Sequence, residues 1–372
     1  MSSPGPDPRR RSIDEAVLAW MREPDFRFDE DRFESLALEL FAFQFAHCAP
    51  YERFCRARER TPQTVRRWFE VPAVPTGAFK EIALHSFPAD RCVARFHTSG
   101  TTTAVRGTLH LDRLDLYEAS LLPTFRRAVL PDLPAGGRVA IRVLASALDE
   151  SPHSSLSHMF DCVVREFGSE DSGYDIRDGA LCSDPLFAAL ERCAGDGRPV
   201  VLAGTAFAFV HLLDAIAAAR VRYMLPAGSR LMECGGFKGR TRTIPRSELY
   251  AELEHALGIP MEFMVNQYGM TELGSQFYDS VLCDPEGMRR KLGPPWARVR
   301  VIDPESGEPA AAGEVGSLTI FDLANTGSIF AVQTADLGRS VEDGFEVLGR
   351  EPGAEERGCS IAADALLAGS TP

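Results

Sequence analysis

Hydrophobic residues follow three different patterns along the chain. In the N-terminal part they recur at helical spacing, and residues 33–48 (FESLALELFAFQFAHC) are apolar on most sides, as in a buried helix. Ser12 or Asp14 can cap the first helix. The pattern predicts helices at residues 13–21, 33–48, 51–60 and 62–69. Two prolines and a glycine then make residues 71–80 an extended connection.

From residue 79 short apolar strands alternate with helical stretches. The predicted strands lie at residues 139–144, 200–203, 230–234 and 261–265. The predicted helices lie at residues 114–129, 154–167, 185–193, 205–219 and 247–257. Strand–helix alternation of this kind predicts a layered α/β fold with a largely parallel sheet.

After residue 293 the pattern changes to short strands joined by turns. Strands are predicted at residues 298–302, 316–321, 330–334 and 345–348, which indicates a β-rich subdomain at about 293–350. We therefore divide the chain into a disordered tail (1–12), a helical segment (13–80), an α/β core (81–350) and a short C-terminal tail (351–372).

Composition narrows the choice of function. The 372 residues are 45% hydrophobic with a formal charge of −13, which disfavours binding to nucleic acid or to anionic membranes. No apolar run approaches the ~20 residues of a transmembrane helix, and the polar start is no secretory signal. Nine cysteines without a CxxC pair suggest a reduced, cytoplasmic protein. Only three lysines occur, at positions 80, 238 and 291.

The segment FHTSGTTT, residues 96–103, is the first candidate for chemistry. It joins a strand end to a cluster of five hydroxyl side chains, and a helix follows. Backbone N–H groups and hydroxyls in a short turn can hold phosphate oxygens. A plain Ser/Thr-rich turn is the alternative.

Two polar turns follow predicted strands further along the chain. In NQYGMTEL (266–273), Thr271 and Glu272 are expected at the carboxyl edge of the sheet, where Glu272 would face solvent and bind Mg²⁺. In ECGGFKGR (233–240), the paired glycines allow a flat ring to approach the backbone. Ordinary turns remain the alternative for both.

Asp336 and Arg350 each follow a predicted strand near the end of the chain. Together they could bind the ribose hydroxyls of one nucleotide, although each alone would be an ordinary surface turn.

The order and spacing of these four segments resemble the adenylate-forming superfamily, which activates carboxylic acids with ATP. Within it, VPTGAFK, GGFKG and the C-terminal GREPGAEERGCSIAADALL resemble the acyl-protein synthetase (LuxE) family nearly end to end. The resemblance implies the large α/β domain of that superfamily, with a helical N-terminus, a β-rich subdomain and a truncated C-terminal domain. It also implies ATP and Mg²⁺ as cofactors.

The resemblance assigns roles to individual residues. It implies that Glu272 binds Mg²⁺, that Thr271 contacts the α-phosphate, and that Cys359 carries the acyl group as a thioester. Asp336 and Arg350 would bind ribose. The remaining ATP contacts would come from Thr98, Ser99, Gly100, Thr101, Thr102, Gly235, Gly236, Tyr268 and Gly269.

Two departures from the superfamily pattern affect these assignments. Thr103 stands where the phosphate loop usually ends in glycine, so that loop must differ locally. The sequence stops 22 residues after Arg350 with no lysine after Lys291, so the usual C-terminal catalytic lysine has no counterpart. Lys238 is the preferred substitute and Lys80 the second; a solvated surface lysine is the alternative for each.

Cys359 follows Gly358 and precedes a predicted short helix, a setting that lowers a thiol pKa. An unreactive tail cysteine is the alternative. An apolar acid pocket is expected around Gly204, Phe207 and Phe237, whereas His153, His158 and His211 show no evident partner in the sequence.

The sequence thus predicts ATP-dependent activation of a carboxylic acid, such as a fatty acid, and transfer of the acyl group to a protein thiol. An acyl-reductase or carrier protein is the expected partner. The alternatives are a phenylacetate-type CoA ligase that uses free CoA, and a catalytically silent nucleotide-binding subunit of a reductase complex.

Overall fold

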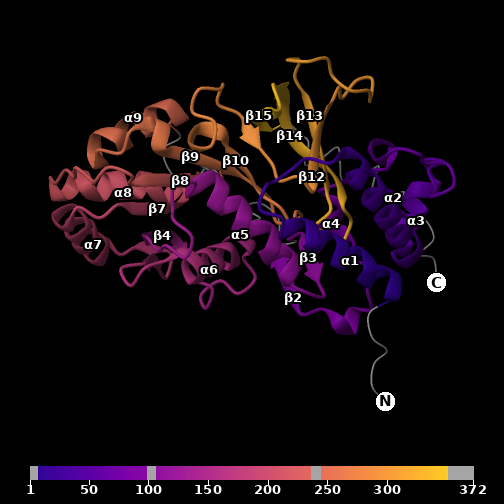
Figure 1. Cartoon of the computed structure of the whole chain (residues 1–372), viewed down its shortest axis with the longest axis horizontal. Helices are drawn as coiled ribbons and strands as arrows, with labels where there is room; N and C mark the ends of the chain where they lie inside the picture. Colours follow the sequence, from indigo (N-terminus) through magenta and orange to yellow (C-terminus); the bar gives the residue numbers. More distant parts are fainter. Residues whose placement is uncertain (1–6, 99–105, 236–243, 351–372) are drawn as a thin grey trace. The chain divides into compact units, whose positions relative to one another are not determined.

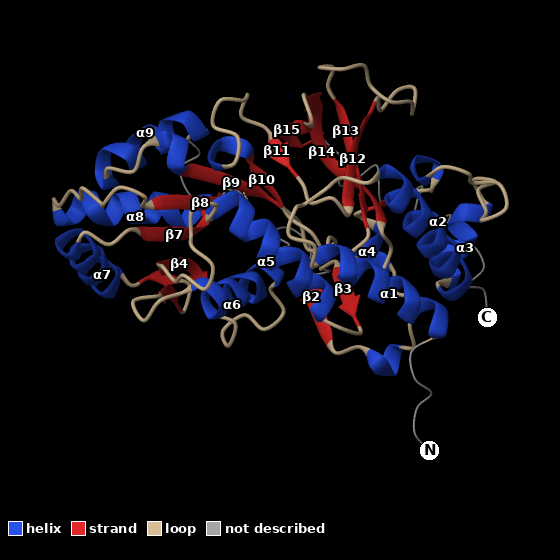
Figure 2. Cartoon of the chain, viewed as in Figure 1, coloured by secondary structure: helices blue, strands red, loops and turns tan. Residues whose placement is uncertain are grey.

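The computed structural model describes residues 7–98, 106–235 and 244–350, and its contacts divide into two compact units (Figures 1 and 2). The first unit comprises Met1–Leu121, Met270–Gln276 and Gly293–Pro372, and the second comprises Leu122–Gly269 and Phe277–Leu292. Helix α5 (Asp115–Val129) contains the boundary between them. Among the described residues, no helix is both long and apolar enough to cross a bilayer.

The first unit begins with helix α1 (Pro8–Met21), which starts earlier than the sequence predicted. The Asp7 side chain accepts a hydrogen bond from Arg9 N at 2.8 Å, and Pro8 occupies the first helical turn. Residues 8–12, expected in a disordered tail, are therefore helical. Asp14, considered above as a cap, instead pairs with Arg10 at 2.8 Å.

Helix α2 (Glu30–His47) is the predicted buried helix, and α3 (Ala49–Arg56) follows it. Gln44 of α2 is fully buried: its Nε2 donates to Asn325 O at 2.9 Å, and its Oε1 accepts from Phe330 N at 3.2 Å. One amide side chain thus satisfies two backbone groups of a distant buried loop, as burial of polar groups requires.

The helix predicted at residues 62–69 is wrong. Only a 3-10 turn, Trp68–Glu70, forms there. Thr61 N donates to the hydroxyl of Thr64 at 2.9 Å, and this local bond competes with helix formation.

The β-rich part of the first unit is an antiparallel sheet in the order β12–β13–β14–β15, as the strand pattern predicted. The short β1 pairs in parallel with β14, and β2 and β3 form a separate antiparallel pair. The elements are β1 (Val74–Pro75), α4 (Ala78–Glu81), the 3-10 turn Ala89–Arg91, β2 (Ala94–His97), β3 (Thr108–Leu111), β12 (Ala297–Ile302), β13 (Gly316–Asp322), β14 (Ala331–Val341) and β15 (Gly344–Arg350).

The second unit contains a mixed sheet in the order β11–β10–β9–β8–β7–β4–β5–β6. Its central strands β9, β8, β7, β4 and β5 are parallel, as predicted, and β10, β11 and β6 pair antiparallel at the two ends. The strands are β4 (Ala140–Ser146), β5 (Gly173–Arg177), β6 (Ala180–Leu181), β7 (Val200–Thr205), β8 (Arg230–Cys234), β9 (Met264–Tyr268), β10 (Phe277–Asp279) and β11 (Lys291–Leu292).

Helices α7, α8 and α9 lie along this sheet and share a hydrophobic core with it (Figure 1). Leu190, Phe209 and Leu253 from these helices are buried together with Leu202 and Leu231 of the strands. Because each helix buries one face, the parallel strands are covered as α/β packing requires. The helices and 3-10 turns are α6 (Ser155–Phe167), α7 (Ser183–Asp196), α8 (Ala206–Ala219), α9 (Arg246–Leu257), Met261–Phe263 and Ser280–Leu282.

We expect Gly204→Ala to lower the free energy of unfolding by about 1–3 kcal/mol, because overpacking a dense core forces neighbouring atoms to shift. Gly204 pairs with Leu144 of β4, and an added Cβ would lie 2.6 Å from both Leu144 Cβ and its carbonyl oxygen. Denaturant unfolding measures the change. Gly195→Ala in α7 is the matched control: no atom lies within 4 Å of its added Cβ, so its stability should be unchanged or slightly higher. Equal effects of both variants would contradict the packing explanation.

Candidate active site

Lys80 and Thr271 each lie near the start of the predicted phosphate-binding segment, within the first unit. Thr98 directly follows β2, and its hydroxyl accepts a hydrogen bond from Gly107 N at 2.9 Å. A Cβ placed on Gly107 would lie 3.0 Å from Thr98 Cγ2 and 3.6 Å from Lys80 Cγ, so the stem of Lys80 lies close to Thr98. Thr271 Oγ1 donates to His97 O at 3.4 Å. One lysine stem and one threonine hydroxyl therefore lie against the start of residues 96–103, which were expected to bind phosphate.

Glu272 is buried, with 6% of its surface exposed, so the expectation that it faces solvent is wrong. Burial raises the pKa of its carboxyl to about 7, helped by the negative charge of Asp336 and opposed by its own backbone N–H, Arg350 and Lys80. The sequence pattern there was that of a polar turn, which is ordinarily exposed, but in the structure the side chain is buried. A carboxyl with a pKa of about 7 gains or loses a proton near neutral pH.

Asp336 and Arg350, predicted to act together, do lie together. They are directly opposite each other in the register of β14 and β15, and Arg350 Nε donates to Asp336 Oδ1 at 3.1 Å. Both charges act on Glu272. We call Lys80, Glu272, Asp336 and Arg350 the Glu272 cluster.

A buried carboxylate holds the turn that follows Glu272. Asp322, at the end of β13, accepts hydrogen bonds from Gly274 N at 2.9 Å, from Ser275 N at 2.8 Å and from the Ser275 hydroxyl at 2.7 Å. Asn325 Nδ2 donates to Glu272 O at 2.7 Å. Burial raises the pKa of Asp322, and its hydrogen bonds oppose that shift. The loop at 322–325 thus fixes the backbone that carries Thr271 and Glu272.

In the second unit, the predicted nucleotide-binding residues lie at the carboxyl ends of parallel strands. Gly235 follows β8 with a φ of 73°, a conformation that favours glycine, and Tyr268 ends β9 beside Gly269. Strands β8 and β9 pair directly, with Cys234 opposite Gln267. The Tyr268 ring is half-buried and lies 6.2 Å from the ring of Phe277.

A buried polar network connects these two strand ends. Glu233 Oε1 accepts from Asn266 Nδ2 at 2.7 Å and from Tyr250 Oη at 3.0 Å, and Arg246 Nε lies 2.9 Å away. Lys291 Nζ donates to Asn266 O and to Asp279 Oδ1, each at 2.7 Å. We call these six residues the Glu233 network. Glu233 and Lys291 are 0% and 4% exposed, so their charges depend on one another.

The expected acid pocket is only partly described. Gly204 is buried in the sheet against Leu144, so its small size is also explained by packing. Phe207, at the start of α8, is half-buried with its ring 4.6 Å from the ring of His211.

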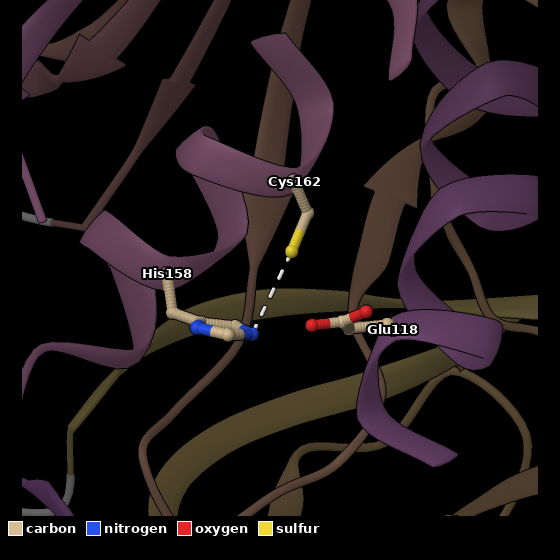
Figure 3. Close-up of side chains that lie close together, drawn as sticks. All are labelled: Glu118, His158 and Cys162. Atoms are coloured by element: carbon tan, nitrogen blue, oxygen red, sulfur yellow. Dashed lines mark hydrogen bonds between the residues drawn. The ribbon is translucent and has the colours of Figure 1, made fainter. Parts of the chain in front are cut away.

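His158 has a partner that the sequence did not reveal. Its Nε2 lies 3.5 Å from the sulfur of Cys162, one turn further along α6 (Figure 3), and both side chains are buried. Within the second unit, this buried contact joins two successive turns of α6.

Several predicted site residues lie outside the described residues: Ser99, Gly100, Thr101, Thr102, Gly236, Phe237, Lys238 and Cys359. Their roles remain predictions. The described sites also include residues that sequence reasoning did not select, namely Glu233, Asn266, Lys291, Asp322 and Asn325. Glu233 lies two residues before Gly235, and Asn266 lies two residues before Tyr268. A polar residue within an apolar strand was the feature of the sequence that could have identified both.

The Glu272 cluster suits a magnesium–nucleotide complex. Mg²⁺ commonly takes one or two carboxylates from the protein and its other ligands from phosphates and water. Glu272, a buried carboxyl on which the charges of Lys80 and Arg350 act, could supply one such ligand, and the two cations could attract phosphate oxygens.

Comparisons with known proteins identify similar sequences and folds. A family model described as "Acyl-protein synthetase, LuxE" matches residues 182–367, half of the chain. A curated relative, the long-chain-fatty-acid–luciferin-component ligase of Aliivibrio fischeri, is 22% identical over 334 residues, covering 86% of this chain and 83% of the relative.

A solved structure of a CoA ligase shares the fold. A 2-hydroxyisobutyryl-CoA ligase, in an open conformation with 2-HIB-AMP and CoA, is 13% identical with a TM-score of 0.62; the match covers 94% of this chain and 80% of that one. ATP-bound MatB from Rhodopseudomonas palustris is 18% identical with a TM-score of 0.49, and this chain spans about half its length, 49%.

The α/β fold is thus the one expected from the sequence pattern, and the family match includes the strand ends of Gly235 and Tyr268 and the TEL turn at Thr271–Leu273. The chain belongs to the acyl-protein synthetase (LuxE) family.

Proposed function

We propose that this protein activates a carboxylic acid with ATP and passes the acyl group to a thiol. In the first step a carboxylate oxygen attacks the α-phosphorus, the bond to pyrophosphate breaks, and acyl-AMP forms. In the second step a thiolate attacks the acyl carbonyl carbon, the bond to AMP breaks, and a thioester remains. The observation that carries the proposal is the convergence of Lys80, Arg350 and Asp336 on the buried Glu272.

The described residues suggest how the substrates are held. Thr98, with the loop after it, would bind the β- and γ-phosphates, and Thr271 would donate to the α-phosphate. Asp336 and Arg350 would bind ribose, while Gly235 and Tyr268 would enclose adenine. Glu272 would hold Mg²⁺, whose charge stabilises the pyrophosphate leaving group.

We propose a fatty acid as the acid, with support from the name of the Aliivibrio fischeri relative. Its acyl chain would lie near Gly204, Phe207 and Phe237. An acyl-reductase or carrier protein would then receive the acyl group. If the protein is instead a CoA ligase, free CoA would receive it. A cytoplasmic location is part of this proposal, supported by the absence of disulfides among the eight cysteines in the described residues.

Glu272→Gln should slow Mg²⁺-dependent acyl-AMP formation by about 10²-fold or more, which corresponds to ~3 kcal/mol of lost transition-state stabilisation. The amide keeps the shape of the side chain but is a poor metal ligand. Because burial raises the pKa of Glu272, ionising it in the folded protein costs free energy above pH ~5, so the variant should be no less stable at pH 8. Pyrophosphate exchange and thermal unfolding measure the two effects.

Glu262→Gln is the matched control, because Glu262 is exposed. It should keep the activity of the wild type. Unchanged exchange in Glu272→Gln would remove this residue from the mechanism, and absence of exchange in the wild type with a panel of acids would favour the silent nucleotide-binding subunit.

Lys80→Ala should slow adenylation by about 10²-fold, because a cation beside the phosphates is lost. Sequence reasoning preferred Lys238, but the described geometry supports Lys80, which lies beside Thr98 and acts electrostatically on Glu272. Lys238→Ala is the comparison variant, with pyrophosphate exchange as the assay. A large effect of Lys238→Ala and none of Lys80→Ala would instead identify Lys238 as the lysine that supports adenylation.

Cys359→Ser should separate the two half-reactions. Pyrophosphate exchange should persist, whereas thioester formation should fail because a serine hydroxyl is barely ionised at neutral pH. Mass spectrometry of the wild type with ATP and acid should show one acyl adduct on Cys359 that neutral hydroxylamine removes. Cys283→Ser is the control. CoA-dependent turnover that survives Cys359→Ser would instead support the CoA-ligase alternative.

A further inference from the structure

The Glu233 network fastens together the two strand ends that carry the proposed adenine contacts. Glu233 lies two residues before Gly235 on β8, and Asn266 lies two residues before Tyr268 on β9. The two residues are directly opposite each other in the strand register, and their side chains are hydrogen-bonded at 2.7 Å. The position of Gly235 relative to Tyr268 therefore depends on this pair.

Lys291 connects that pair to the antiparallel strands β10 and β11 of the same sheet. It is opposite Asp279 in the register of β10 and β11, and its Nζ binds Asp279 Oδ1 at 2.7 Å. The same Nζ binds the backbone oxygen of Asn266 at 2.7 Å and its side-chain oxygen, while Asp279 Oδ2 accepts from Asn266 N at 3.0 Å. Lys291 and Asp279 thus hold the backbone and side chain of Asn266 from both sides.

The bond from Lys291 also fixes which way the Asn266 amide points. Because the ammonium only donates, it selects the amide oxygen, and the amide nitrogen is then directed to Glu233. A neutral or shortened side chain at position 291 would leave this amide free to rotate and would loosen β8 from β9. The effect would reach Gly235 and Tyr268 without any contact between Lys291 and the nucleotide.

We infer that Lys291 is a positioning residue for ATP: acting through Asn266 and Glu233, its charged form sets the spacing of the two strand ends that enclose the adenine. This inference rests on the proposed function, because it takes Gly235 and Tyr268 to be adenine contacts.

The charge of Lys291 responds to pH in an accessible range. Burial lowers its pKa to about 8, against the raising effects of Asp279 and Glu233 and with a further lowering effect of Arg246. The other titratable groups in contact are Tyr250, hydrogen-bonded to Glu233, and Arg289, whose Nη1 lies 3.5 Å from Asp279. The ammonium contacts are therefore present below pH 8 and are lost as the pH rises through that value.

The test is the affinity for ATP with Mg²⁺, measured by titration calorimetry between pH 7.5 and 9.5. If only the protonated state binds well, wild-type affinity should fall roughly eight- to tenfold from pH 7.5 to pH 9. Lys291→Arg, which stays charged throughout, should retain affinity at pH 9. Lys291→Met should bind about tenfold more weakly already at pH 7.5 and should lack the pH-dependent fall.

Circular dichroism checks that each variant is folded. Should Lys291→Arg fail to fold, Asp279→Asn takes its place: loss of the carboxylate lowers the pKa of Lys291, so the fall in affinity should move to lower pH. ATP affinity that is flat from pH 7.5 to 9.5 in the wild type, or unchanged in Lys291→Met, would overturn the inference and leave the proposed function intact. A wild type that binds no ATP at any pH would overturn both.

Discussion

A buried carboxylate must be hydrogen-bonded or paired, and within each unit this constraint orders the segments that carry the predicted site residues. Burial without partners would cost several kcal/mol for each charged group. In the second unit, Glu233 Oε1 accepts hydrogen bonds from β9 and α9, and Asp279 accepts them from β9 and β11. In the first unit, Asp322 accepts them from the turn at Gly274 and Ser275. These bonds restrict the motion of the segments that they join.

In the first unit the constraint fixes the turn that carries Thr271 and Glu272. Asp322 accepts three hydrogen bonds from Gly274 and Ser275, and Asn325 binds the carbonyl of Glu272. Gln44 of α2 in turn holds the backbone of Asn325. Helix α2 therefore helps to fix the backbone of Glu272, the proposed metal ligand, through two successive hydrogen bonds.

Burial raises the pKa of Glu272, as it raises those of Glu233 and Asp322, but the charged neighbours of Glu272 are the residues proposed to bind the nucleotide. The pKa of Glu272 is raised to about 7 by burial, and its charged neighbours Lys80, Arg350 and Asp336 do not cancel that shift. Metal binding requires the ionised carboxylate, and a divalent cation would compensate the free-energy cost of burying that charge. Perturbed groups of this kind concentrate at functional sites.

The sequence by itself determined the order of elements and the identity of the chemistry. Strand–helix alternation predicted the parallel sheet, the buried helix at 33–48 formed as α2, and Asp336 and Arg350 were expected together before any contact was known. These features depend on local periodicity and on motifs that a single segment carries. The start of α1 was misplaced because Asp7 is a stronger cap than the residues chosen, and residues 62–69 formed a turn because threonine side chains compete with the helix.

Only the tertiary structure decided which polar residues are buried and which charged groups lie beside one another. The sequence alone does not distinguish the surroundings of Lys80 from those of Lys291. In the structure Lys80 lies beside Thr98, whereas Lys291 is enclosed by Asn266 and Asp279. Glu272 lies in a polar turn of the sequence but is buried in the structure, where Asn325 binds its carbonyl oxygen and Asp322 binds the next residues of the turn. The physical reason is that burial, pairing and pKa depend on residues brought together from distant positions, and local sequence patterns do not record those contacts.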